Sequence, residues 1–207
     1  MKYLLTIFLF IIPIFAEAQN TIIHDKSTFL SGGIGVIQSS SSSEELTSKY
    51  LPNVLFQVGF GIPINSHLFI YNRISFASKS DFQAYVRLEQ INQLVEATSS
   101  FSQLIYNAGL RYSIYIIQDW SFGFSAGFTY SVVNNKSTLK GELFQSLDNQ
   151  NLYGYFGGID LEHRFQDSHF SAFGEALYNY IRNDNIYFRD KFSGMNLSAG
   201  VRFYFQK

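Results

Sequence analysis

The sequence of 207 residues has no cysteine, only three prolines, and few charged residues, which make up 15% of the chain. Without cysteine there are neither disulfide bonds nor thiolate metal ligands. The formal net charge is −1 and residues of both signs are interspersed, so the chain has no basic region of the kind that binds nucleic acid. Because 46% of the residues are hydrophobic and 18% aromatic, a disordered chain is also excluded.

Long apolar runs are missing as well, apart from one at the N-terminus. No run reaches the roughly 18 to 20 residues that a membrane-spanning helix needs. Lys2, the apolar residues 4–15 and the Ala16-Glu17-Ala18 site have the order of a secretory signal peptide. We therefore predict a signal peptide over residues 1–18 and a single mature domain over 19–207. No cysteine follows the signal, so the mature chain has no residue to carry a lipid anchor.

What the mature chain does have is alternation of apolar and small or polar residues, the period of β-strands. In 120–130, large apolar residues from Trp120 to Tyr130 alternate with Ser, Gly and Thr. The same pattern recurs in 54–62, 104–116, 153–165 and 195–205. It is weaker in 28–37, 67–77 and 170–180. These eight segments predict eight strands.

The connections between the strands alternate in length. Short turns are predicted at 63–66, 118–119 and 166–168, and long polar loops at 38–53, 78–100, 132–151 and 181–191. Short and long connections at opposite ends indicate an up-and-down meander. The expected fold is all-β, an eight-stranded antiparallel transmembrane β-barrel with short periplasmic turns and long external loops.

One segment, 82–89, has two interpretations. Its residues alternate as in a strand, but a helix face is also possible, formed by Tyr85, Leu88, Asn92 and Val95. It is therefore expected to be either a continuation of the third strand beyond the bilayer or a short helix in the second long loop.

The distribution of residues between the two faces separates a membrane barrel from a soluble barrel such as a lipocalin. In these strands the apolar faces are wide and aromatic, and the opposite faces carry Gly, Ser, Asn, Arg and Glu. The interior of an eight-stranded barrel has room only for packed side chains, so the small and polar faces belong inside. The aromatic faces then point outward, which requires lipid. Aromatic girdles are expected at Trp120, Phe122 and Phe165 near the short turns, and at Tyr130, Tyr153, Tyr178 and Tyr180 near the long loops.

The chain ends in Gly200-Val201-Arg202-Phe203-Tyr204-Phe205, which is similar to the aromatic C-terminal strand of outer-membrane barrels. With the strand pattern, it resembles the small outer-membrane β-barrel proteins of Gram-negative bacteria, which include OmpA transmembrane-domain-like, OmpX-like and PorT-like members. The resemblance implies an outer-membrane location, contact with outer-membrane lipid, and recognition by the outer-membrane assembly machinery through Val201, Phe203 and Phe205. Gln206 and Lys207 depart from a strictly terminal aromatic residue.

Charged residues on the inward faces predict a network inside the barrel. Isolated charges in a low-dielectric interior are very unfavourable, so these residues must pair or bind water. The simplest interpretation is a salt-bridged plug that closes the lumen; passage of protons or ions along the same residues is the alternative. The four cations and three anions concerned are Arg73, Arg111, Arg164 and Arg202 with Asp160, Glu162 and Glu175.

No catalytic, cofactor or metal site is predicted. His169 and Ser171 with Glu175 are the nearest arrangement to a catalytic set, and all three are expected to point inward at the periplasmic end, away from the outer leaflet where lipid-modifying barrels act. Asp167, Ser168 and His169 are adjacent in a tight turn and lack the geometry of a triad. His24, His67 and His163 have no metal-ligand spacing.

Four functions remain, in order of preference. The first is a structural or interaction protein whose external loops bind an extracellular partner on a rigid barrel. The second is an accessory of secretion or assembly, suggested by the PorT-like resemblance, with a periplasmic protein partner at the short turns or at 20–27. Narrow-pore transport and lipid A modification follow.

Overall fold

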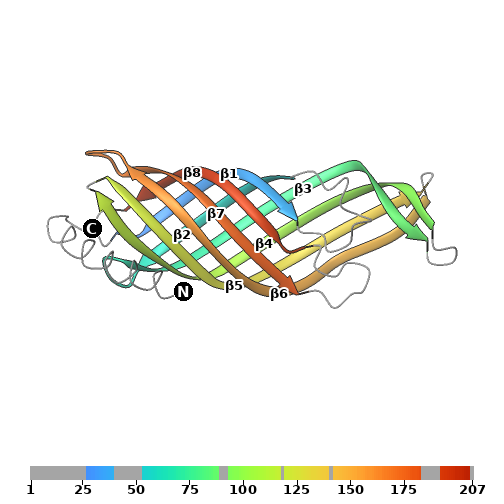
Figure 1. Cartoon of the computed structure of the whole chain (residues 1–207), viewed down its shortest axis with the longest axis horizontal. Helices are drawn as coiled ribbons and strands as arrows, with labels where there is room; N and C mark the ends of the chain where they lie inside the picture. Colours follow the sequence, from blue (N-terminus) through green and yellow to red (C-terminus); the bar gives the residue numbers. More distant parts are fainter. Residues whose placement is uncertain are drawn as a thin grey trace, which may run out of the picture.

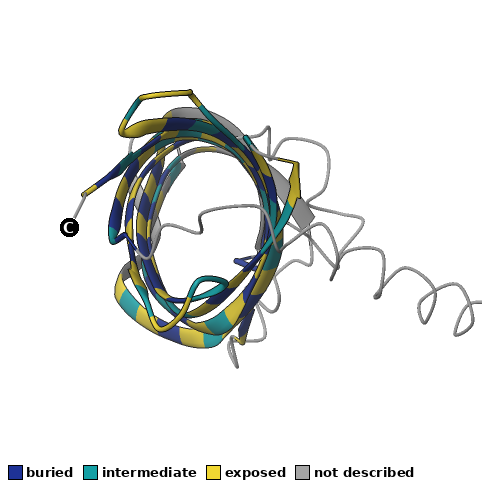
Figure 2. Cartoon of the chain, turned by 90° about the vertical axis from the view of Figure 1, so that its left-hand side faces the viewer, coloured by how far each residue is buried: buried dark blue, intermediate teal, exposed yellow. Residues whose placement is uncertain are grey.

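The computed structural model describes residues 27–39, 53–88, 93–117, 119–139, 142–182 and 192–205. They form eight strands, each antiparallel to the next, and β1 also pairs with β8 to close a barrel (Figures 1 and 2). This is the predicted fold class. The strands are β1 (Phe29–Ser39), β2 (Asn53–Pro63), β3 (Leu68–Leu88), β4 (Gln93–Ile117), β5 (Trp120–Leu139), β6 (Glu142–Arg164), β7 (Phe170–Arg182) and β8 (Gly194–Tyr204).

Side chains alternate between the lumen and the exterior along the wall of the barrel. In β2, Leu55 and Gln57 are buried whereas Phe56 and Val58 are exposed. Figure 2 looks along the barrel and shows buried and exposed residues alternating around the ring. Small and polar residues point inward and large apolar residues outward, as their places in the sequence pattern predict.

The short turns lie at one end of the barrel, together with the two ends of the described chain. They connect β2 to β3, β4 to β5 and β6 to β7. The backbone N–H of Phe205 donates to the carbonyl of Thr28 at 2.9 Å, so the segments that lead into β1 and out of β8 lie side by side. Short turns are expected on the periplasmic side of an outer-membrane barrel, so we call this end the periplasmic end.

At the other end, four strands continue well past the rest, and the prediction of long loops at 78–100 and 132–151 is wrong there. β3, β4, β5 and β6 have 20 to 25 residues each, against 11 to 13 for the other four strands. They form a four-stranded projecting sheet (Figure 1). The ambiguous segment 82–89 is accordingly a continuation of the third strand, and a helix there is wrong.

The projecting sheet, here residues 78–88, 93–103, 133–139 and 142–152, has two edges that receive no strand from the barrel. Pairing of β2 with β3 stops at Leu55 and Ala77, although β3 runs on to Leu88. Pairing of β7 with β6 stops at Arg182 and Tyr153, although β6 begins at Glu142. Within the described residues, no strand pairs with the outer edge of β3 beyond Ala77 or with the outer edge of β6 before Tyr153.

Other predictions fall outside the described part of the chain. These are the signal peptide at 1–18 and most of the two predicted long loops at 38–53 and 181–191. Among the described residues, no helix is long and apolar enough to cross a membrane.

Candidate functional site

The lumen contains most of the buried charge of the barrel. Arg73, Arg111 and Arg202 are each 1% exposed, and Asp160, Glu162 and Glu175 are also buried. Three cations therefore face three anions inside the wall. Arg164, the fourth predicted cation, is only half-buried at the end of β6, where its guanidinium lies 4.2 Å from the centre of the Tyr204 ring.

Four of these side chains form what we call the ionic cluster: Arg111, Asp160, Glu162 and Arg202. Arg111 donates to both oxygens of Asp160, from Nε at 2.9 Å and from Nη2 at 2.6 Å. Arg202 donates from Nη1 to Asp160 Oδ1 at 2.9 Å and also to Glu162. Glu162 lies 3.1 Å from Arg111 Nη2. Each carboxylate thus contacts both guanidinium groups, and β4, β6 and β8 are joined across the lumen.

Neutral donors complete the coordination of Glu162. Ser171 Oγ donates to it at 2.5 Å, and the hydroxyl of Tyr204 donates to it as well. Arg111 Nη1 donates to Ser113 Oγ at 2.5 Å. Buried charges are tolerated when their hydrogen-bonding groups find such partners, because the low dielectric then strengthens each contact.

A second pair, Arg73 and Glu175, connects opposite sides of the wall from β3 and β7. Gln57 accepts from Arg73 at 3.1 Å, and Gln57 donates to Ser198 at 3.0 Å. Tyr71 donates its hydroxyl proton to Glu175 at 3.0 Å.

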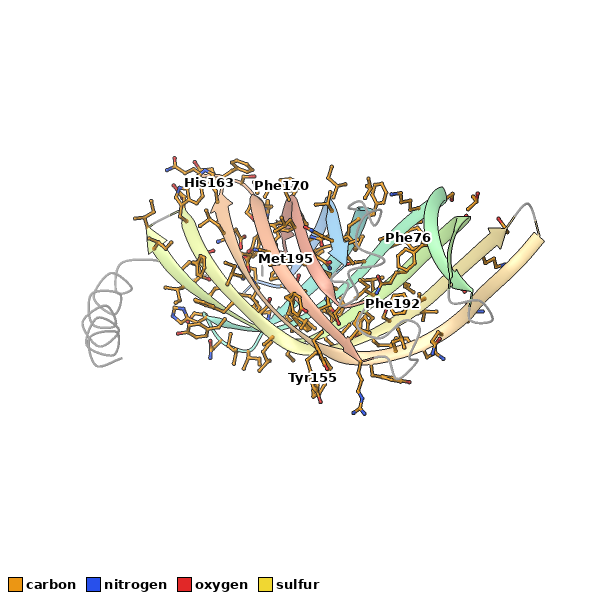
Figure 3. The ribbon with its side chains drawn as sticks, turned by 45° about the vertical axis from the view of Figure 1, so that its right-hand side comes forward. Phe76, Tyr155, His163, Phe170, Phe192 and Met195 are labelled. Atoms are coloured by element: carbon orange, nitrogen blue, oxygen red, sulfur yellow. The ribbon has the colours of Figure 1, made fainter. Side chains whose placement is uncertain are left out.

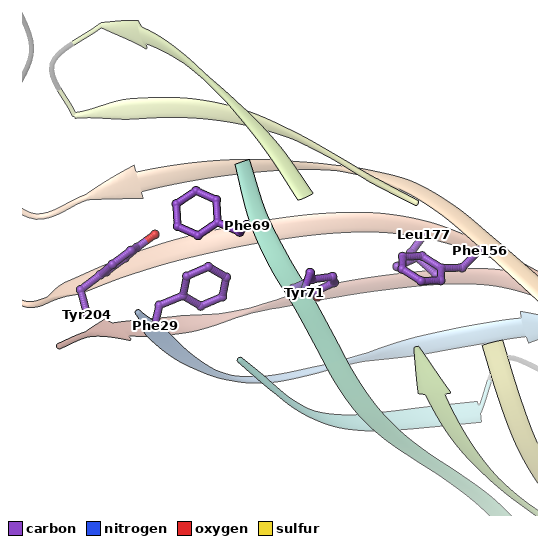
Figure 4. Close-up of a cluster of buried hydrophobic side chains, with 6 residues drawn as sticks. All are labelled: Phe29, Phe69, Tyr71, Phe156, Leu177 and Tyr204. Atoms are coloured by element: carbon purple, nitrogen blue, oxygen red, sulfur yellow. The ribbon is translucent and has the colours of Figure 1, made fainter. Parts of the chain in front are cut away.

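Aromatic rings surround the ionic cluster at the periplasmic end. Phe29, Phe69 and Tyr204 lie together there, with Phe29 5.7 Å from Phe69 and 5.6 Å from Tyr204, measured between ring centres (Figure 4). The guanidinium of Arg202 lies 4.4 Å from the centre of the Phe173 ring and 5.2 Å from that of Phe29. Cation–π contacts of this kind attract the guanidinium to the ring more strongly where water is excluded.

Further toward the outer end, uncharged polar side chains line the lumen, and we call them the polar layer. Thr129 Oγ1 lies 2.9 Å from Asn107 Oδ1 and 3.2 Å from Asn179 Oδ1, which links β4, β5 and β7. Gln103 donates to Ser131 at 3.0 Å. The polar layer consists of Ser75, Gln103, Asn107, Thr129, Ser131, Asn179 and Asn196.

The outermost part of the lumen is apolar. Phe101, Val133, Leu152, Ile181 and Phe192 form one buried cluster, here called the apolar cap. Phe192 comes from the residues before β8 and stacks on Phe101, with ring centres 6.1 Å apart and planes 7° from parallel. Next to it, Ser193 Oγ accepts from the backbone N–H of Ile181 at 2.9 Å. These contacts hold residues 192 and 193 over the outer mouth.

The exterior of the barrel is apolar, with Phe128 69% exposed and Ile34 63% exposed. The girdle residues predicted near the long loops stand on β5, β6 and β7, where Tyr130 faces Tyr153 across the strand pair with ring centres 5.4 Å apart. Near the short turns, Trp120 is partly exposed beside His163, and Phe122 packs edge-on against Phe124. Phe165 lies in the β6–β7 turn. Tyr155 and Met195 also belong to the outer surface (Figure 3).

Val201, Phe203 and Phe205 share the outer face of β8 and its end. Phe203 packs between Phe170 and Phe205, with ring centres 5.1 Å away in both cases. The structure therefore presents these three side chains as one apolar strip at the periplasmic rim.

The structure does not bring His169 and Ser171 together as a catalytic pair. Ser171 is fully buried and donates to Glu162, whereas His169 is exposed. The expectation that His169 points inward is wrong, because β7 begins only at Phe170 and strand alternation does not extend into the turn before it. The described residues contain no group of three or more His, Asp or Glu side chains that could hold a metal ion.

Similarity to known proteins was found at the level of structure alone. No family model matches the sequence, and no curated protein is similar to it in sequence. Three solved structures resemble the barrel over nearly their full lengths. Neisserial surface protein A is 15% identical, with a TM-score of 0.55, over 86% of this chain and 97% of that one. Ail, the attachment invasion locus protein of Yersinia pestis, was solved with the heparin analogue sucrose octasulfate. It is 13% identical, with a TM-score of 0.57, over 87% of this chain and 99% of that one. The outer membrane protein OprG of Pseudomonas aeruginosa is 11% identical, with a TM-score of 0.60, over 89% of this chain and 98% of that one.

The fold is that of small outer-membrane β-barrels. Its outer surface agrees with this, because an exterior of exposed Phe, Ile, Leu and Val side chains requires hydrocarbon around it. The solved structures that share this fold are described as surface, attachment and outer-membrane proteins.

Sequence reasoning did not predict the projecting sheet or the polar layer. The alternation in 82–88 was a signal for the projecting sheet. Asn107 and Asn196 of the polar layer were already predicted on the inward faces of their strands, but alternation alone does not determine which inward residues meet across the lumen.

Proposed function

We propose that this protein is a membrane-anchored binding protein, with a barrel closed to solutes and a projecting sheet that binds a protein partner outside the cell. The observation that carries the proposal is the pair of outer edges, residues 80–88 of β3 and 142–152 of β6, to which no described strand is paired. A free edge presents backbone N–H and C=O groups in the spacing of a strand, so that an extended segment of another protein adds to it as a further strand.

The charges of the projecting sheet and its two connections favour a protein over a polyanion. Residues 78–100 and 132–151 hold four basic and five acidic residues, so the region has no excess of positive charge. Ail was solved with a heparin analogue, which is a polyanion, and this chain lacks the basic balance for such a ligand. The residues counted are Lys79, Arg87, Lys136 and Lys140 with Asp81, Glu89, Glu96, Glu142 and Asp148.

The closed lumen is a further part of the proposal. It is supported by the ionic cluster, by the Arg73–Glu175 pair and by the apolar cap, which together fill the interior at three levels. An eight-stranded barrel has an interior only wide enough for side chains, so these contacts leave no aqueous path. Recognition of Val201, Phe203 and Phe205 by the assembly machinery is proposed on the apolar strip that they form. The secretion-accessory role stays a prediction.

The test compares the full-length protein with a barrel whose projecting sheet is shortened. One variant replaces residues 80–100 with Asn-Gly and a second also replaces 134–149 with Asn-Gly, a pair that favours tight hairpins. Both cuts leave Phe101 and Val133 of the apolar cap in place. Cells that display each form are assayed for attachment to a panel of immobilised proteins and to heparin.

The expected result is attachment to a protein by the full-length form and its loss in the form with both cuts, because the first cut alone leaves the edge of β6 in place. A heat-dependent gel shift checks that all three forms are folded. Equal attachment by full-length and shortened barrels would contradict the proposal. Attachment to heparin alone would replace the protein partner with a polyanion.

A further inference from the structure

The histidines that the structure describes all lie at the periplasmic end of the barrel. His67 is in the turn between β2 and β3, His163 is near the end of β6 (Figure 3), and His169 is in the turn between β6 and β7. None of the three is buried. They stand at the level of the aromatic girdle near the short turns, where lipid headgroups are expected. We call these three residues the histidine rim.

Each imidazole of the histidine rim packs against an aromatic ring of the outer surface. The three pairs share one geometry, with ring planes 31° to 33° apart. The distances between ring centres are 4.6 Å for His163 and Trp120, 5.8 Å for His67 and Tyr112, and 5.7 Å for His169 and Phe203. A protonated imidazole in such a place is attracted to the ring as a cation, so these contacts also suit the charged form.

The backbone fixes two of the imidazoles. Nδ1 of His67 lies 3.0 Å from the carbonyl oxygen of Ser113, and Nδ1 of His169 lies 3.2 Å from that of Tyr204. Because a carbonyl oxygen only accepts, Nδ1 is the nitrogen that carries the hydrogen in both rings. Nε2 is then the nitrogen that gains the second proton and becomes a charged donor.

Protonation of the histidine rim reverses the charge of this end. Besides the ionic cluster, the other charged side chains that the structure describes there are Asp119, Asp167 and the half-buried Arg164. Two carboxylates and one guanidinium give a net charge of −1, and three imidazolium groups change it to +2. Histidine ordinarily makes this change between about pH 5 and 8. The histidine rim therefore favours anions at the lower end of this range.

The positions of the three imidazoles favour a lipid over a soluble ligand. They belong to separate connections and strands, so they present one cation each to the surroundings of the barrel instead of enclosing one small molecule. Their aromatic neighbours Trp120, Tyr112 and Phe203 are on the outward faces of the strands, which are expected to meet lipid. An anionic group held at headgroup level is a phosphate of a phospholipid, and basic side chains near a membrane surface are attracted to such lipids.

We propose that the histidine rim, when protonated, binds the phosphate groups of anionic phospholipids in the leaflet that faces the periplasmic end. The barrel then prefers these lipids more strongly in acid than at neutral pH. This inference is independent of what the projecting sheet binds.

The test measures the lipid preference of the folded protein in vesicles of phosphatidylcholine with a minor share of phosphatidylglycerol. The immobilised fractions of spin-labelled phosphatidylglycerol and spin-labelled phosphatidylcholine report how strongly the barrel prefers the anionic lipid. Measurements at about pH 5.5 and about pH 8 bracket the protonation of histidine. Inorganic phosphate is then added at each pH as a soluble competitor.

The variants separate the histidines from other charges. One variant replaces all three residues of the histidine rim with glutamine, which gains no proton, and another replaces them with arginine, which stays positive. The control is Lys136→Gln, which removes an exposed cation from the projecting sheet, at the opposite end of the protein. Folding of each variant is checked by heat-dependent gel mobility.

We expect the preference for phosphatidylglycerol to rise about threefold from the higher to the lower pH in the wild-type protein and in Lys136→Gln. The rise should be absent from the glutamine variant, and the arginine variant should show a high preference at both pH values. If the glutamine variant does not fold, the single variants His67→Gln, His163→Gln and His169→Gln should each lose part of the rise.

Two results would overturn the proposal. The first is a preference that does not change with pH in the wild-type protein, and the second is a rise that remains after the histidines are replaced. Loss of the preference on addition of inorganic phosphate would replace the lipid with a free anion as the ligand.

Discussion

Asp160 shows most clearly how single residues hold the barrel together. It accepts two hydrogen bonds from Arg111 and one from Arg202, and it is buried with both. An ion pair of this kind gives little net stability over an apolar core, but removing one partner leaves a buried charge without compensation. The residues of the ionic cluster are therefore expected to be individually sensitive.

Asp160→Asn should lower the free energy of unfolding by about 3 to 5 kcal/mol, because both arginines lose a charged acceptor. Asp167→Asn is the matched control, because Asp167 is exposed in the β6–β7 turn with a positive φ of 55°, which asparagine also tolerates. Urea unfolding in lipid vesicles, followed by the fluorescence of the single tryptophan Trp120, measures both. Equal stabilities of the two variants would refute the importance of the cluster.

Gly123 is the second sensitive position. It lies opposite Asp160 on the neighbouring strand, and an added Cβ would lie 2.1 Å from Asp160 Oδ2 and 2.9 Å from Arg111 Nε. Gly123→Ala should cost about 1 to 3 kcal/mol by displacing that ion pair. Gly157→Ala, where a Cβ meets nothing within 4 Å, should change stability by less than about 0.5 kcal/mol in the same unfolding assay. Similar losses at both glycines would indicate a backbone effect instead.

Single strands differ in how well their sequences predict them. The alternation in β2 and β5 identified their inward and outward faces, because lipid on one side and packed side chains on the other impose opposite chemistry. In the outer part of β3 the alternation continues through 82–88, whereas in 142–152 of β6 Gln, Ser and Asn interrupt it, so only one of these two strands had a clear period-2 signal there. The contacts of the ionic cluster depend on the stagger of the strands around the barrel, which alternation alone does not determine.

At the scale of β8, the apolar strip at its end is expected to matter for assembly. Phe205→Ser should lower the amount of folded protein in the outer membrane several-fold when the chain is expressed in cells. Phe165→Ser is the control, since Phe165 is a similarly exposed aromatic residue at the same end, in the β6–β7 turn. Folded protein is quantified by the heat-dependent band in outer-membrane fractions, and an equal decrease for both variants would argue against a role specific to β8.

For the molecule as a whole, closure of the lumen predicts no ion conduction. The ionic cluster, the polar layer and the apolar cap fill the interior in succession. In planar lipid bilayers, the purified protein should produce no stable conductance steps at neutral pH. Long-lived open channels of uniform conductance would show that the interior rearranges into a pore.

The aromatic and aliphatic faces of the strands are expected to meet lipid, and the charged faces to fill the lumen. The electrophoretic mobility of residues 19–207, the predicted mature chain, refolded in detergent micelles and applied with and without boiling, tests this directly. We expect a heat-dependent shift in mobility, because a closed barrel resists the gel detergent until it is heated. A chain that folds and stays soluble without detergent, and shows no shift, would contradict it.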